Sequence, residues 1–137
     1  KDNIDKFATH GENDNFCVIR DFGQPQMWFN SSLMKFNNSN ATEFIWDKFL
    51  QNKQTDLALQ GDQNVITNYM KENPGVQKLM IYPDTWTQSY KWLDRSQTRF
   101  HKKSFTYEES PEAKVAIFHG NPKPHESDQE WVKNNWK

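Results

Sequence analysis

Residues 114–126 read Lys-Val-Ala-Ile-Phe-His-Gly-Asn-Pro-Lys-Pro-His-Glu, an apolar run followed at once by a polar loop. The run Val115–Phe118 is typical of a buried strand, and the loop after it holds one glycine, two prolines, a lysine and two histidines. Ser127 and Glu130 have the spacing of a capping box, which predicts a terminal helix directly after the loop. A strand, a stiff polar loop and a helix in this order predict a functional site at the carboxyl end of the strand.

The rest of the chain alternates between short apolar runs and amphipathic segments. The predicted strands are Phe16–Ile19, Trp28–Phe36 and Lys78–Tyr82, with a short edge strand within Trp86–Leu93. The predicted helices are Ala41–Gln51, with Asn40 as its N-cap, and a segment that Asp62 caps and that Asn73-Pro74-Gly75 ends. This order predicts a single α/β or α+β domain over residues 1–137, with a mixed sheet flanked by helices.

Composition narrows the class of protein. Hydrophobic residues make up 34% of the chain and aromatic residues 15%, so the core must depend on large aromatic side chains. The formal net charge of -1 argues against a nucleic-acid partner, because such proteins usually carry a basic patch. No apolar stretch reaches the ~20 residues of a membrane span. The single Cys17 cannot form an internal disulfide, which favours a cytoplasmic protein with a buried free thiol.

The loop after Phe118 has the side chains needed to bind an anion. Gly120 would let the backbone approach a phosphate closely, and Lys123 would supply a positive charge. The imidazole of His119 could bind a divalent cation or a phosphate oxygen. In the alternative interpretation, Lys123 is a solvated surface lysine and His119 a hydrogen-bonded histidine at the end of a strand.

Two polar segments elsewhere also allow two interpretations. Asn30-Ser31-Ser32 interrupts the second strand, either because these side chains bond neighbouring backbone at a bulge or because they line a polar pocket. Asp62 precedes a helical pattern, and an N-cap role alone would explain it.

Several of these segments together resemble one family of enzymes. Gly120-Asn121-Pro122-Lys123-Pro124 is similar to the Gly-x-x-Lys-Pro segment of GT-A type glycosyltransferases related to glycogenin and the bacterial galactosyltransferases. Phe29–Phe36 resembles the Phe-Asn-Ser-Gly strand of those enzymes, and Gly61–Ile66 resembles their Asp-Gln helix start. Uncharacterised bacterial and phage glycosyltransferase-like proteins carry a similar set, which corresponds here to Arg20-Asp21, Asn30-Ser31-Ser32, Gly61-Asp62-Gln63 and His119–Glu126.

The resemblance implies a role for each matched residue. Asp62 would be the catalytic residue facing the acceptor or the transferred sugar, while Gly120 and Lys123 would contact the donor diphosphate. The other substrate-binding residues that it implies are Asn30, Ser31, Ser32, Gln63, Arg20 and Asp21. His119 would be a ligand of a divalent cation, Mn²⁺ or Mg²⁺. The family motif, however, has its histidine three residues before the glycine, where this chain has Ile117.

The part of the family fold that binds the nucleotide has no counterpart in the sequence, because no Asp-x-Asp motif is present. We therefore expect a partial GT-A-like fold that lacks the N-terminal nucleotide-binding half and has little or no transferase activity alone. The intact enzyme would bind a nucleotide sugar and a carbohydrate acceptor, and the incomplete sheet predicts a homo-oligomer. Whether this chain is an enzyme stays open. The alternative is a non-catalytic carbohydrate-binding or assembly module whose aromatic side chains stack on sugar rings, namely Trp86, Tyr90 and Trp92.

Overall fold

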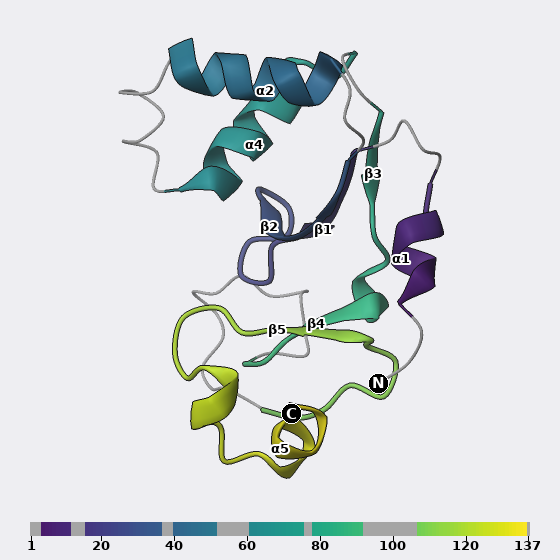
Figure 1. Ribbon diagram of the computed structural model, residues 1–137, viewed down its shortest axis with the longest axis vertical. Coiled ribbons are helices and arrows are strands. Elements are labelled where there is room, and N and C mark those ends of the chain that lie inside the picture. The colour runs from purple at the N-terminus through teal and green to yellow at the C-terminus, as the bar shows by residue number, and fades with distance from the viewer. Residues whose placement is uncertain are drawn as a thin grey trace.

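The computed structural model describes residues 4–11, 16–36, 40–51, 61–75, 78–91 and 107–136 (Figure 1). Its helices are α1 (Asp5–Thr9), α2 (Asn40–Gln51), α4 (Asp62–Glu72) and α5 (Glu130–Asn135), with 3-10 turns η1 (Asp84–Trp86) and η2 (Pro124–Glu126). Its strands are β1 (Phe16–Arg20), β2 (Phe29–Lys35), β3 (Leu79–Ile81), β4 (Thr87–Ser89) and β5 (Val115–Ile117).

The strands form two small sheets. The first has the order β2-β1-β3, in which β1 pairs with β2 antiparallel and with β3 parallel. The second consists of β4 and β5, which run parallel. The predicted mixed sheet with flanking helices is thereby confirmed at the level of fold class. In Figure 1, α2 and α4 lie at the upper left of the first sheet, whereas the β4–β5 pair and α5 lie below it.

Strand β1 is the centre of the core, and its side chains alternate between two faces of the sheet. Cys17 and Ile19 pack into a cluster with α1 and the β4–β5 pair; its other buried members are Phe7, Phe22, Tyr82 and Ile117. Phe16 and Val18 pack on the opposite face against α4, with Tyr69 and Met70. We call the first the aromatic face and the second the helical face.

The aromatic face holds a buried hydroxyl and a buried thiol. Tyr82 is only 2% exposed, and its hydroxyl donates a hydrogen bond to the carbonyl oxygen of Phe7 at 2.9 Å. Burial raises the pKa of Tyr82 to about 12. Burial also raises the pKa of the free Cys17 thiol, and this effect outweighs the nearby positive charge of Lys35, which lowers the pKa.

Two details of the predicted elements are corrected and a third is confirmed. Asp62 is the first residue of α4 and not its cap, because Gly61 occupies the N-cap position. The short strand predicted within Trp86–Leu93 is confirmed as β4, whose three residues are all buried and pair with β5, while residues 92–93 lie outside the described residues. Helix α2 begins at Asn40, one residue earlier than predicted, and the side chain of Asn40 lies outside the described part.

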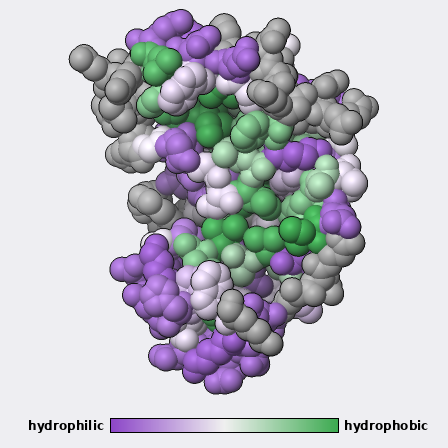
Figure 2. Space-filling model, viewed as in Figure 1, coloured by the Kyte–Doolittle hydropathy of each residue, from purple (hydrophilic) through white to green (hydrophobic). Residues whose placement is uncertain are grey.

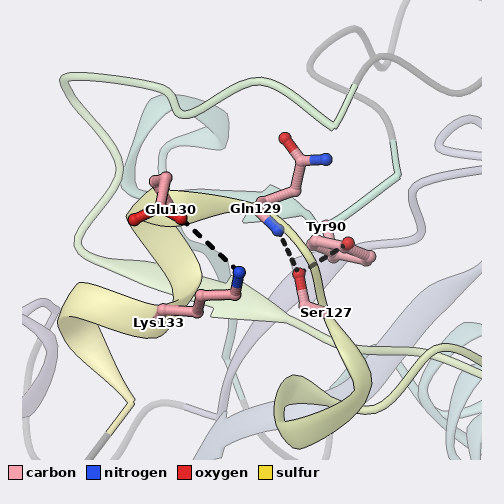
Figure 3. Close-up of polar contacts among 5 residues, drawn as sticks. All are labelled: Tyr90, Ser127, Gln129, Glu130 and Lys133. Atoms are coloured by element: carbon pink, nitrogen blue, oxygen red, sulfur yellow. Dashed lines mark hydrogen bonds and ion pairs between the residues drawn. The ribbon is translucent and has the colours of Figure 1, made fainter.

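The predicted capping box of the last helix is also wrong. Helix α5 begins at Glu130 after the N-cap residue Gln129. Figure 3 shows the reason: the Ser127 hydroxyl bonds the buried Tyr90 hydroxyl at 2.8 Å and accepts the backbone N–H of Gln129 at 3.2 Å. Ser127 therefore anchors the approach to the helix, while Glu130 pairs with Lys133 at 3.5 Å.

Candidate functional site

The carboxylate of Asp21 joins three segments that lie far apart in the sequence. One oxygen, Oδ1, accepts the backbone N–H groups of Gly23 and Gln24 at 2.8 and 2.7 Å, which fixes the turn after β1. The other, Oδ2, accepts the side-chain amides of Asn30 at 3.4 Å and Gln63 at 3.3 Å. The end of β1, the start of β2 and the first turn of α4 therefore meet at one carboxylate.

A second set of hydrogen bonds fixes the two amides. Asn30 is 6% exposed, and its Oδ1 accepts the backbone N–H of Ser32 at 2.9 Å. Thr67 is fully buried; its hydroxyl donates to the carbonyl oxygen of Gln63 at 2.7 Å and accepts the N–H of Phe29 at 3.1 Å. We call Asp21, Asn30, Gln63 and Thr67 the Asp21 junction. Asn30 thus makes both the local backbone bond and a contact within a polar cluster.

The loop after β5 reaches this region through the residue next to Asp21. Phe22 is 2% exposed, and its ring stacks on the imidazole of His119, with centroids 5.8 Å apart and an angle of 12° between the planes. On the other side of Asp21, Arg20 forms a two-bond ion pair with Asp84, with distances of 3.2 and 2.7 Å. All four segments of the resemblance are therefore represented at one end of the first sheet.

The positive charge next to Gly120 comes from a residue that the sequence did not single out. Gly120 has a φ of +74°, and a Cβ placed there would lie 3.4 Å from Nζ of Lys91. The buried hydroxyl of Ser89 accepts the backbone N–H of Lys91 at 3.0 Å and bonds Nε2 of His119 at 2.7 Å. Lys91 follows β4 just as the loop follows β5, and parallel strands bring their carboxyl ends together. A predicted parallel pairing of these strands would have pointed to Lys91.

Two predicted site residues lie at the surface, outside the Asp21 junction itself. Lys123 is exposed, and its backbone N–H donates to the Glu126 carboxylate at 2.7 Å. Asp62 is also exposed, and its Oδ1 accepts the backbone N–H of Gln63 at 2.8 Å. Asp62 therefore touches the Asp21 junction only through the Gln63 backbone, and neither side chain bonds the Asp21 carboxylate, which among the described residues accepts Gly23, Gln24, Asn30 and Gln63. Of the two serines predicted beside an acceptor, Ser31 is half-buried and Ser32 is exposed.

The described residues do not fit a divalent cation. No group of three or more His, Cys, Asp or Glu side chains within them is arranged to hold a metal ion. Nε2 of His119 is already bonded to Ser89, and both oxygens of Asp21 accept N–H groups. These donors would have to be displaced before either side chain could bind a cation.

The aromatic residues proposed to stack on sugars are used in packing where they are described. Tyr90 is 3% exposed and stacks on Phe118 with centroids 4.5 Å apart. Trp86 contacts Phe7 edge to face at 5.2 Å, and Nζ of Lys6 lies 4.1 Å from its ring centre. Trp92 lies outside the described residues.

No family model, curated protein or solved structure matches the chain. We therefore infer the function from the geometry of the site and from the resemblance of its segments. Among the described residues, no helix has the length and apolar character needed to cross a membrane.

Proposed function

We propose that this chain forms the acceptor-side part of a GT-A-like glycosyltransferase that uses a nucleotide sugar. The observation that supports the proposal is the meeting of four separated segments. Asn30 and Gln63 both donate hydrogen bonds to Asp21, and Phe22 stacks on His119. These segments were selected for their resemblance to one family, and a shared site would require them to be close together in space.

In this proposal the loop after β5 contacts the donor diphosphate. The ammonium group of Lys91 stands beside the Gly120 backbone, where it would stabilise the negative charge that develops on the leaving diphosphate. Lys123 lies three residues after Gly120 and is exposed, so it would add positive charge at the edge of the same loop. The Asp21 junction holds the loop in place through Phe22 and does not itself take part in the chemistry.

Asp62 keeps its proposed role on the acceptor side of the reaction. The proposal contains no step through a divalent cation, because the described residues do not fit one. A requirement for Mn²⁺ or Mg²⁺ stays a prediction for the intact enzyme, as do the homo-oligomeric state and the cytoplasmic location. Among the described residues, nothing favours the carbohydrate-binding alternative, since Trp86 and Tyr90 are engaged in packing.

Calorimetric titration with UDP-glucose, with and without Mn²⁺, tests the proposal. We expect weak, salt-sensitive and metal-independent binding, which Lys91→Ala weakens roughly tenfold because a hydrogen bond to a charged group is lost. Lys123→Ala should weaken binding less, and the exposed Lys78 on the far end of β3 supplies a matched control, Lys78→Ala.

Two results would contradict parts of the proposal. Equal affinities of the wild-type and Lys91→Ala chains for UDP-glucose would show that the loop after β5 does not contact the diphosphate. Tight, Mn²⁺-dependent binding would show that the nucleotide-binding part is present in this chain after all.

A further inference from the structure

On the helical face of the first sheet, a cavity of about 550 Å³ that is open to solvent lies between the sheet, α2 and α4. Its walls are Phe16 and Met34 from the strands, Ile45 and Phe49 from α2, and Val65 and Ile66 from α4. Figure 2 shows hydrophobic atoms exposed in a hollow beneath the hydrophilic outer side of α2. The volume lies within the range of roughly 300–1,000 Å³ that is usual for small-molecule sites.

The walls of this cavity are rich in aromatic rings. Phe16 and Phe36 stack with centroids 6.0 Å apart, and Trp46 and Phe49 stack with centroids 5.5 Å apart. Such walls can satisfy few of the hydrogen bonds of a sugar or a nucleotide, so either ligand would lose free energy on leaving water. The faces of aromatic rings also carry a negative potential, which favours a cationic ligand.

The charge at the mouth of the cavity also favours a cationic ligand. Asp62 lines the cavity, and none of the described lining residues is a Lys, Arg or His. Thr42 on α2 adds one hydroxyl. An anionic ligand would be repelled by the Asp62 carboxylate, whereas an ammonium group would be attracted to it.

We propose that this cavity binds a small organic cation, with an apolar aromatic body between α2 and α4 and an ammonium group against Asp62. The site is separate from the proposed diphosphate site, because His119 of the loop after β5 stacks on Phe22 of the aromatic face. It shares only Asp62 with the proposed acceptor side. This inference does not depend on the glycosyltransferase proposal.

Three probes with the same aromatic body test the proposal on the full chain. They are 2-(2-naphthyl)ethylammonium, the neutral 2-(2-naphthyl)ethanol and the anionic 2-naphthylacetate, each titrated by calorimetry and by amide NMR shifts. We expect the cation to bind most tightly, up to about fivefold more tightly than the alcohol, because an exposed ion pair contributes little. The anion should bind most weakly, and the shifts should concentrate at Val65 and Ile66.

Two variants separate the contribution of the cavity to binding from that of the Asp62 charge. Val65→Phe should weaken the binding of all three probes, because the larger ring narrows the cavity between α4 and the sheet. Asp62→Asn should leave the affinity for the alcohol unchanged and reduce the affinity for the cation to that for the alcohol. Asp62 is exposed, so Asp62→Asn tests the charge even if Val65→Phe does not fold. The exposed Asp128 supplies a matched control, Asp128→Asn, which should change nothing.

The proposal is overturned if the wild-type chain binds the alcohol as tightly as the ammonium compound, since a purely apolar site would behave in this way. Tighter binding of the anion would also overturn it. Undiminished binding by folded Val65→Phe would place the ligand elsewhere.

Discussion

The two faces of the first sheet receive alternate side chains from the same strand, yet they are packed differently. The aromatic face is filled by Phe7, Tyr82 and their neighbours, and its buried hydroxyl has a partner. The helical face is closed next to β1 by Tyr69 and Met70 but leaves a cavity of about 550 Å³ toward α2.

The difference shows where this fold leaves room for a ligand. On the aromatic face the Phe7 ring packs edge to face against Tyr82 and Trp86, and Phe22 stacks on His119. On the helical face α4 packs closely on the sheet, while α2 and the outer part of α4 enclose space. The comparison predicts that substitutions on the aromatic face destabilise the protein most, and that the cavity tolerates larger side chains.

The largest expected effect is that of truncating a ring on the aromatic face. Phe7→Ala should lower the free energy of unfolding by about 4 kcal/mol, because the ring is 6% exposed and contacts Tyr82 and Trp86. The matched change on the helical face is Phe49→Ala, which should cost about 1 kcal/mol because this half-buried ring already borders the cavity. Urea unfolding measures both, and equal costs would refute the contrast between the faces.

The next effect concerns the attachment of α4 to the sheet. Asp21→Ala should cost about 3 kcal/mol, because the carboxylate accepts four N–H groups, from Gly23, Gln24, Asn30 and Gln63. Asp21→Asn keeps one acceptor oxygen and should cost less. The control is Asp62→Ala, with a cost of about 0.5 kcal/mol for an exposed carboxylate at a helix start. If the two alanine variants were equally stable, the junction would not hold the helix.

The buried hydroxyl of the aromatic face predicts a loss of stability in alkali. Burial, with a smaller effect of the neighbouring Cys17, raises the pKa of Tyr82 from 10.0 to about 12 in the folded protein, so folding favours the protonated form. This contribution is complete below pH 10 and is lost as the pH rises from 10 to about 12, by about 2 kcal/mol. Urea unfolding at increasing pH should show the loss.

Two phenylalanine variants assign this loss to one face of the sheet. Tyr82→Phe should remove the larger part of the pH dependence. Tyr69→Phe on the helical face should remove less, although burial raises the pKa of Tyr69 as well. The reverse order would place the stronger desolvation on the helical face.

The smallest expected effect is that of adding volume to the cavity. Val65→Phe should change the free energy of unfolding by less than about 1 kcal/mol, because the ring enters existing space. On the aromatic face, Ile19→Phe should destabilise the protein by about 2 kcal/mol, because Ile19 is 1% exposed within close packing. Thermal unfolding compares the two, and a large loss for Val65→Phe would mean that the cavity cannot accept a ring.

The sequence predicted the elements better than their contacts. The composition of Phe16–Ile19 and the apolar spacing in α4 were enough to locate a strand and a helix, because both signals depend on near neighbours. The capping role of Ser127 was predicted wrongly, because the buried Tyr90 hydroxyl competes for the same side chain. A capping pattern contains no information about such a distant partner.

The candidate site shows the same limit. The resemblance selected Asp21, Asn30 and Gln63 as separate substrate-binding residues, and the structure makes them one hydrogen-bonded junction. Lys91 carries no motif, and only the parallel pairing of β4 with β5 brings it beside Gly120. The ion pair of Arg20 with Asp84 likewise joins residues that no local pattern relates.

The loop after β5 illustrates what each level of description contributes. Glycine, prolines and a strand end within one short segment identify a stiff polar loop, because backbone conformation depends mainly on residues close in sequence. The identity of its nearest cation, the ring that packs on His119 and the cavity on the opposite side of the sheet depend on how separate layers pack. Such contacts have no period and no spacing in the chain, so only the folded arrangement of the layers specifies them.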